Sequence, residues 1–402
     1  MKSSSVLICW EIGGGLGHLY RINPIASEFK RRGMHVILAI PESFRDTSGL
    51  QEFGFEVIFF PKSRVPVSER SGILSHTYGE NLLKNGFSDR DYLLWRLKNW
   101  EQILKTIKPA VVIAEHAPYA LLAAKTLGFP VAAIGTGFSL PPFQCPMPGL
   151  QPWFQLPDSV LRKKEQSFLE LVNPALLEAR YSLLKSVSDI FSDVETFLCT
   201  LNELDHYKVP RNAEYIGPVV YSQLDSDIFW LSDSKENIFV YLRKSSKYFR
   251  PVIKLLSEKG LPSFVYGLGL SSEEAEALST KTVKVNNKPV CLGNAFEKCR
   301  FAITEGGHNT GALMLLQGIP ILILPGQLEQ AILSYRISEN NLGLSVNYFN
   351  SRSDVKEKLE IMLHSDELSR NAKKFSEKYS KCISIKAEKI IVDRCQVLLL
   401  KR

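Results

Sequence analysis

Short apolar runs recur along the first part of the chain, and amphipathic stretches separate them. The first run is VLICW at residues 6–10, which ends in glycines; an amphipathic stretch follows at 20–32, and the run HVILAI follows at 35–40. Apolar positions three and four apart indicate a helix, whereas a short uninterrupted run bounded by glycine indicates a buried strand. The order therefore predicts strand, glycine loop, helix and strand, which is a βαβ unit.

The same alternation continues to about residue 222. Strands and helices are expected in turn at EVIFF (56–60), YLLWRLKNWEQILKTI (92–107), AVVIAE (110–115), YALLAAKTLG (119–128) and PVAAIG (130–135). The strand runs lack polar alternation, which is typical of a parallel sheet that helices cover on both faces. A loop rich in proline and aromatic residues follows at 141–157, then helices to about Ser192, then an extended segment at 214–222.

The second part of the chain repeats this construction after a polar linker at 225–234. Strands are expected at 237–242, 262–268, 282–287, 300–304, 320–325 and 343–347, and helices at 247–260, 309–317, 330–340 and throughout 354–400. A chain of 402 residues is too long for one ordinary core. We therefore predict an α/β protein with a first domain at 1–222, a second domain at 235–380 and a final helical segment at 381–402.

Composition excludes several classes of function. No apolar run approaches the roughly 20 residues that span a bilayer, and the start of the chain is not expected to be a signal peptide. Seven scattered cysteines without a CxxC pair argue against a disulfide framework and for a reducing cytoplasm. The net charge of +7 suits a phosphate-bearing ligand or peripheral contact with the anionic inner face of a membrane. The sequence has no basic run interleaved with aromatic residues, so nucleic acid is not an expected partner.

Two glycine-rich loops are the candidate binding sites. One spans Gly13–His18 and the other spans Glu305–Thr310, and each follows an apolar strand and opens a helix. Ligands of open parallel sheets bind at such strand ends, where glycines allow close backbone approach and helix N–H groups favour anions. The first loop taken alone fits a tight turn equally well. It also fits a dinucleotide site badly, because no acidic residue ends the second strand.

A carboxylate and an amide stand just past the strand that follows the second loop. Glu329 and Gln330 are suited to sugar hydroxyls, because one accepts hydrogen bonds and the other both donates and accepts them. Alternatively, Glu329 only complements a helix dipole. Asp225 and Asp227 resemble a metal-binding pair but lack further ligands, so no metal site is expected.

These residues carry a resemblance to a known family. AITEGGHNTGALMLLQGIPILILPGQLEQ (302–330) resembles the donor-binding signature of the UDP-glucuronosyl, plant secondary-product and antibiotic glycosyltransferases. GGGLGHLYRINPIASEFKRRGMHV (13–36) is similar to the first loop and helix of that family, and to those of the N-acetylglucosaminyltransferase that makes lipid II. The resemblance implies the GT-B fold: two Rossmann-like domains that face each other across a cleft, with the last helix crossing back to the first domain.

The resemblance also implies a reaction and its residues. It implies metal-independent, inverting transfer from a nucleotide diphosphate sugar, with His18 as general base and Glu115 as its carboxylate partner. The competing interpretations are a helix-capping role for His18 and a plain surface position for Glu115, with His116 beside it. The residues implied to bind the donor, a UDP- or dTDP-sugar, are Gly15, Gly17, Ser245, Glu305, Gly306, Gly307, His308, Asn309, Thr310, Glu329 and Gln330.

Three positions depart from the family pattern. Glu305 stands where a histidine usually contacts the diphosphate, and it would repel that group unless protonated or paired with a base such as Arg243. His308 is a partial replacement for that histidine. Leu313 stands where many members have a glutamate for the ribose, and Asn287 where plant members have a stacking tryptophan. The base and the ribose therefore have no assigned contacts, which is compatible with a deoxyribose donor.

Alternatives to the active transferase remain. The chain is alternatively a catalytically inactive nucleotide-sugar-binding subunit, because Glu305 could disable turnover, or a sugar epimerase on the same fold. The acceptor is a small molecule, a glycan or a lipid-linked sugar, and the loop at 141–154 either covers it or is a packed surface loop.

Overall fold

The structure is a computed structural model that describes residues 5–45, 54–60, 75–220, 228–290, 296–349, 354–380 and 386–400. The chain forms two compact units. Unit 1 comprises Met1–Leu201, Asp205–Val219 and Lys386–Arg402, and unit 2 comprises Asn202–Leu204 and Val220–Ile385. The domain boundaries drawn from the sequence stay predictions, because two of them fall at 221–227 and 381–385, outside the described residues.

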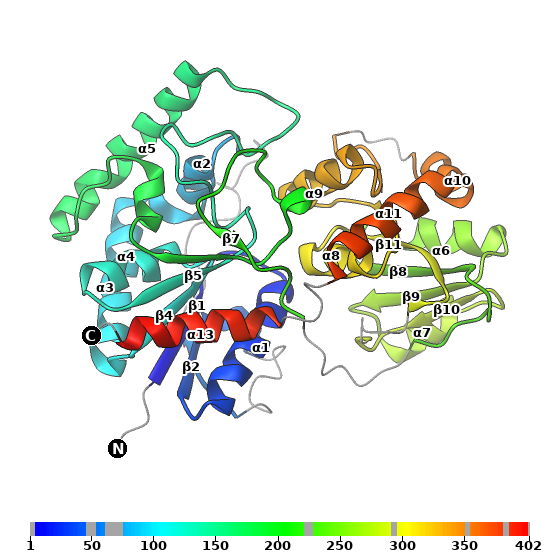
Figure 1. Ribbon diagram of the computed structural model, residues 1–402, viewed down its shortest axis with the longest axis horizontal. Helices are drawn as coiled ribbons and strands as arrows, with labels where there is room; N and C mark the ends of the chain where they lie inside the picture. The colour runs from blue at the N-terminus through cyan, green and yellow to red at the C-terminus, as the bar shows by residue number, and fades with distance from the viewer. Residues whose placement is uncertain are drawn as a thin grey trace. The chain divides into compact units, whose positions relative to one another are not determined.

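Unit 1 is built on a parallel sheet of seven strands in the order β3-β2-β1-β4-β5-β6-β7 (Figure 1). The strands are β1 (Ser5–Trp10), β2 (His35–Pro41), β3 (Glu56–Phe60), β4 (Val111–Glu115), β5 (Val131–Gly135), β6 (Glu195–Leu198) and β7 (Glu214–Tyr215). Strand β1 is buried on both faces: Val6, Ile8 and Trp10 join one core cluster, and Leu7 and Cys9 join the other. This explains the absence of polar alternation in its sequence.

Helices cover both faces of this sheet. The helices are α1 (Gly17–Arg31), α2 (Tyr78–Leu82), α3 (Arg90–Ile107), α4 (Pro118–Thr126), α5 (Asp158–Glu178) and α13 (Ala387–Leu400). Helices α1 and α13 contribute side chains to the cluster around Val6, whereas α2, α3, α4 and α5 contribute to the cluster around Leu7. The short helical turns are η1 (Glu42–Phe44), η4 (Leu83–Phe87) and η5 (Val187–Phe191).

Unit 2 is built on a parallel sheet of six strands in the order β10-β9-β8-β11-β12-β13 (Figure 1). The strands are β8 (Asn237–Arg243), β9 (Ser263–Leu268), β10 (Val283–Asn286), β11 (Cys299–Thr304), β12 (Ile321–Ile323) and β13 (Gly343–Ser345). The helical elements are α6 (Phe249–Glu258), α7 (Ser272–Leu278), α8 (His308–Leu316), α9 (Leu328–Glu339), α10 (Val355–His364), α11 (Asp366–Lys378) and the turn η6 (Asn202–Leu204). Helix α6 buries Phe249, Val252, Ile253 and Leu256, the spacing of one helical face.

The two parallel sheets confirm the predicted α/β fold class. Three short elements were missed by the sequence analysis: β6, α2 and α7. Their length explains this, since four to seven residues give too little periodicity to separate them from loops. Helix α7 still carried a usable signal, because Ser271 and Glu274 form a capping box at its start.

Helix α13 packs against α1 within unit 1 (Figure 1). Its residues Ile391, Val392 and Cys395 are fully buried in the same cluster as the α1 side chains. Arg32, which follows α1, donates to Gln396 Oε1 at 2.7 Å and pairs with Asp393. The last helix therefore completes the core of the unit that contains the first strand. Among the described helices, none combines the length and the apolar character needed to cross a bilayer.

The buried face of α13 gives a stability prediction. Replacing Ile391, which is fully buried, with alanine leaves a cavity beneath α1 and should cost about 2–5 kcal/mol of unfolding free energy. The matched control is Val397→Ala on the same helix, where the side chain is 50% exposed and the expected change is within about 0.5 kcal/mol. Urea denaturation followed by circular dichroism measures both; equal effects of the two substitutions would contradict the described packing.

Candidate active site

The candidate residues lie where the strand order of each sheet reverses. In unit 1 the chain runs from β1 outward to β2 and β3, then returns to β4 on the other side of β1. Trp10 at the end of β1 pairs with Glu115 at the end of β4. In unit 2, β8 and β11 have the same relation, and Tyr241 pairs with Thr304. The carboxyl ends of such strand pairs form the crevice in which α/β sheets bind ligands.

His18 is hydrogen-bonded to Glu115 in unit 1. Nδ1 of His18 lies 2.8 Å from Oε1 of Glu115. An ionised carboxylate can only accept, so this bond requires the proton on Nδ1, and in the neutral tautomer the lone pair is then on Nε2. The alternative helix-capping role is not what this side chain performs, because the N-cap of α1 is Leu16. The geometry is that of a base and its orienting carboxylate, and the catalytic role stays a prediction.

Arg21 is the third member of this cluster, and the sequence analysis missed it. Glu115 has no solvent exposure, and Arg21 donates through Nη1 to the same oxygen that His18 contacts. Burial opposes ionisation of Glu115, but the charge of Arg21 and the hydrogen bond with His18 hold its pKa below the usual value. The available signal was spacing, because residues three apart on a helix share a face.

Gly13 allows the ring of His18 to approach the first loop. The backbone of Gly13 has φ +115°, and a Cβ added there would overlap Nε2 of His18. The ring of Trp10 stacks on that of His18, with centroids 4.8 Å apart. Gly15 and Gly17 are exposed in the same loop, and Gly17 is the first residue of α1.

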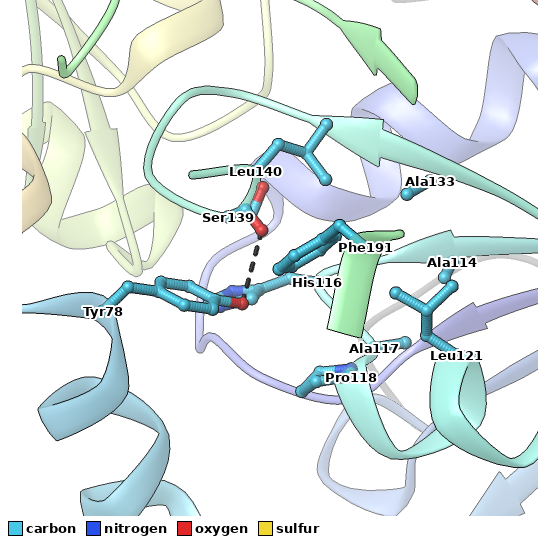
Figure 2. A pocket seen from close by; sticks show the side chains of 10 residues that line it. All are labelled: Tyr78, Ala114, His116, Ala117, Pro118, Leu121, Ala133, Ser139, Leu140 and Phe191. Atoms are coloured by element: carbon cyan, nitrogen blue, oxygen red, sulfur yellow. Dashed lines mark hydrogen bonds between the residues drawn. The ribbon is translucent and has the colours of Figure 1, made fainter. Parts of the chain in front are cut away.

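A small pocket with mostly apolar walls lies beside this cluster, at the ends of β4 and β5 (Figure 2). Tyr78 and His116 stand on one side of it, and Tyr78 donates from its hydroxyl to the carbonyl of Ser139 at 3.3 Å. The lining residues are Tyr78, Ala114, His116, Ala117, Pro118, Leu121, Ala133, Ser139, Leu140 and Phe191. Nearly all of these side chains are buried, so the pocket is a small interior cavity rather than an open binding surface.

His116 is held in an unusual backbone conformation between the pocket and His18. Its φ is +44°, which is rare for a residue other than glycine, and its carbonyl accepts from the N–H of Ile12 at 3.0 Å. Its ring centroid lies 6.2 Å from that of His18, and its Nε2 has no hydrogen-bond partner among the described residues. Burial is the main cause that lowers the pKa of His116, to about 3. The imidazole is therefore neutral at physiological pH.

The second glycine loop lies in unit 2, at the end of β11. Gly306 has φ +87°, and a Cβ there would come within 2.8 Å of Ile323 Cγ2, so this turn requires glycine. Its N–H donates to Thr304 Oγ1 at 3.1 Å. Gly307 is the N-cap of α8, and His308, the first helical residue, is buried. The loop therefore places the N-terminus of α8, which favours anions, just past the end of β11.

The other donor-binding candidates surround this loop within unit 2. Asn309 and Thr310 are partly exposed in the first turn of α8, and Ser245 is exposed just after β8. Gln330 is buried in α9, and its Oε1 accepts from the N–H of Gly326 at 2.8 Å. Glu329 precedes it in the first turn of α9. The sequence-based candidates of this unit therefore gather at neighbouring strand ends.

Glu305 is paired, as the sequence analysis required if this position is to tolerate a diphosphate. Nε of Arg243 donates to Oε2 of Glu305 at 2.6 Å. Arg243 ends β8 and Glu305 directly follows β11, so the pairing of these two strands brings the two charges together. Asp225 and Asp227, weighed as a metal site, lie outside the described residues.

The loop at 141–157 combines buried and exposed side chains. Met147 and Leu150 are buried, whereas Phe143 and Phe154 are half exposed. The ring of Phe154 lies 5.5 Å from that of His76, centroid to centroid. The loop is thus anchored in unit 1 and still presents aromatic surface to solvent.

Comparison with solved structures finds the same fold over nearly the whole chain. The calicheamicin glycosyltransferase CalG4 matches with a TM-score of 0.70 at 14% identity, over 99% of this chain and 99% of that chain. The glycosyltransferase VinC in complex with dTDP matches with a TM-score of 0.66 at 13% identity, over 99% and 100%. The Streptomyces sp. SF2575 glycosyltransferase SsfS6, complexed with thymidine diphosphate, matches with a TM-score of 0.64 at 15% identity, over 97% and 99%.

No protein-family model and no curated protein matches the sequence. At identities of 13 to 15%, the structural matches show the fold alone. They confirm the fold resemblance to antibiotic glycosyltransferases that the two glycine-rich motifs predict.

The environment of His116 predicts how stability depends on pH. With a pKa of about 3 in the folded chain against 6.5 when unperturbed, His116 takes up a proton on unfolding throughout that interval. Its contribution to stability therefore decreases as the pH falls from 6.5 towards 3. His116→Asn, which tolerates positive φ, should lose less melting temperature than wild type between about pH 7 and pH 4.5. His35→Asn, at an exposed histidine, is the control and should follow wild type.

Proposed function

We propose that the protein is a metal-independent, inverting glycosyltransferase that moves a sugar from a nucleoside diphosphate to an acceptor hydroxyl. The observation that carries this proposal is the His18–Glu115 hydrogen bond at the strand crossover of unit 1. A glycine loop, an imidazole and a buried carboxylate behind it are the parts of a general base for a hydroxyl group. The GT-B fold of the antibiotic glycosyltransferases supports the same reaction class.

The residues of unit 1 activate the acceptor. Nε2 of His18 takes the hydroxyl proton as the acceptor oxygen attacks the anomeric carbon, and the bond from that carbon to the diphosphate oxygen breaks. Glu115 stabilises the imidazolium formed in this step, and Arg21 keeps Glu115 ionised. The acceptor attacks opposite the leaving group, so the anomeric configuration inverts.

The residues of unit 2 hold the donor. The turn at Gly306 and Gly307 and the start of α8, with Asn309 and Thr310, bind the diphosphate through N–H and hydroxyl groups. The sugar is bound by Glu329 and by the amide nitrogen of Gln330, whose oxygen already accepts from Gly326. Because the departing diphosphate is stabilised by these donors, the reaction needs no metal ion.

The proposed donor is a UDP- or dTDP-sugar. The bound thymidine diphosphate of VinC and SsfS6 supports dTDP. Leu313 supports it as well, because it stands where an acidic residue would bind the ribose hydroxyls, and a deoxyribose donor lacks one of these hydroxyls. Free cysteines at positions 9, 145, 199, 299 and 395 support a cytoplasmic setting. A lipid-linked acceptor would add contact with the inner membrane face, and acceptor assays with and without vesicles distinguish this case.

The first test combines donor binding with turnover. Thermal-shift measurements with UDP-, dTDP- and GDP-sugars identify the donor, since a ligand that binds the folded state raises the melting temperature. Transfer and donor hydrolysis are then measured in EDTA for wild type and His18→Ala. We expect His18→Ala to lose about 10²–10⁴-fold in kcat and to bind the donor as wild type does. Wild type that binds donor without any turnover would instead indicate a nucleotide-sugar-binding subunit.

A glycine pair tests the position of the base. Gly13→Ala places a methyl group against Nε2 of His18 and should reduce kcat by at least about tenfold, a barrier increase of about 1.4 kcal/mol. Gly14→Ala is the matched control, because a Cβ at Gly14 meets nothing within 4 Å. Steady-state kinetics at saturating donor report both. Equal activity of the two variants would argue against a catalytic Nε2 in this loop.

A further inference from the structure

Arg243 stands at the point where three strand ends of unit 2 meet. It is the last residue of β8, and its Nε is bound to Glu305, which follows β11. Its Nη2 lies 4.0 Å from the position that a Cβ on Gly326 would take, in the loop after β12. The guanidinium therefore lies against the glycine whose N–H is bound by Gln330.

The contacts of this ion pair leave one side of the guanidinium available. Oε2 of Glu305 accepts the hydrogen bond from Nε of Arg243, and Oε1 accepts one from the backbone N–H of Arg243 at 3.4 Å. The Nη1 and Nη2 groups of Arg243 make no hydrogen bond to the described residues, and its side chain is 42% exposed while that of Glu305 is 12% exposed. Glu305 thus holds the guanidinium through Nε and leaves its two Nη groups, the edge that binds phosphate oxygens, without a hydrogen bond to the described residues.

A purely structural ion pair explains this arrangement less well. A partly exposed pair contributes only about 0–1 kcal/mol to stability. Glu305 directly precedes the turn into α8, but it contacts Arg243 and not the N–H groups of that helix. A carboxylate beside an anion site is unfavourable unless its charge is balanced, and Arg243 supplies that balance. Lys244, the next residue, is already paired with Glu274.

We infer that Arg243, oriented by Glu305, is the cation that binds the diphosphate of the donor and stabilises it as it leaves. The inference rests on the proposed function and deepens it, because it gives the leaving group a specific partner. It also explains Glu305: the carboxylate orients the arginine that takes over the contact a histidine would otherwise make. Arg243 is bound to Glu305, which precedes the glycine turn assigned to the diphosphate, and it lies close to Gly326, whose N–H donates to the amide oxygen of Gln330.

The test is isothermal titration of UDP, dTDP and inorganic pyrophosphate into wild type and four variants. Arg243→Ala should weaken binding of the preferred nucleoside diphosphate by about tenfold to a hundredfold, because a charge-assisted contact is lost and Glu305 is left uncompensated. Arg243→Ala with Glu305→Gln should recover part of that loss. Glu305→Gln alone should bind at least as tightly as wild type. Lys244→Ala, which removes the same charge one residue away, should change affinity less than about threefold.

The outcomes separate this inference from the proposed function. Arg243→Ala that is folded and binds within about twofold of wild type overturns the inference and leaves the transferase proposal intact. A double variant no better than Arg243→Ala also overturns it, because Glu305 would then not be the compensated charge. If wild type binds the diphosphate without any turnover and Arg243→Ala binds it tenfold more weakly, the inference is supported and the transferase proposal is defeated.

Discussion

The parallel pairing of β1 with β4 is the constraint on which the candidate site of unit 1 depends. It sets Trp10 opposite Glu115, so the loop that leaves β1 passes over the end of β4. Helix α1 then carries His18 and Arg21 to the same carboxylate oxygen. A buried carboxylate is costly unless it is paired, and here both partners come from one helix. Local folding of α1 and pairing of two strands distant in sequence therefore fix the cluster together.

In unit 2 the same kind of strand pairing brings a carboxylate next to an arginine. Pairing of β8 with β11 brings Arg243 and Glu305 together at the strand crossover, as β1 and β4 bring together the residues around Glu115. In unit 1 the carboxylate is fully buried and is hydrogen-bonded to the imidazole of His18. In unit 2 the carboxylate is nearly buried and orients a partly exposed guanidinium. The same strand crossover thus brings together the residues proposed as the base in the first unit and as the anion-binding cation in the second.

At both candidate sites a glycine is required because a side chain there would collide with a neighbouring residue. At Gly13 a side chain would collide with Nε2 of His18, and at Gly306 it would collide with Ile323. Both residues also have positive φ, so any other residue would be strained there even with room for a side chain. The buried and strained His116 adds a neutral imidazole beside an apolar pocket. The proposed base and the predicted pH dependence of stability therefore rest on neighbouring residues of unit 1.

The sequence by itself determined most of the strands of the two sheets and the positions of the two loops. Unbroken apolar runs followed by glycine identify buried parallel strands, and helical spacing identifies the helices between them, because these signals are local. The motifs further indicated His18, Glu115, Arg243 and Glu305 as candidates. Short elements such as β6 and α7 were missed because they contain too few residues to show a period.

Only the tertiary structure decided which of these side chains meet. Residues 18 and 115, or 243 and 305, are far apart in sequence, and strand order rather than local pattern brings each pair together. The same is true of Arg21, whose importance depends on the burial of Glu115, and of the strained backbone at His116. Periodicity reports which face of an element is buried, whereas hydrogen bonds and burial between distant residues depend on the register of the whole sheet.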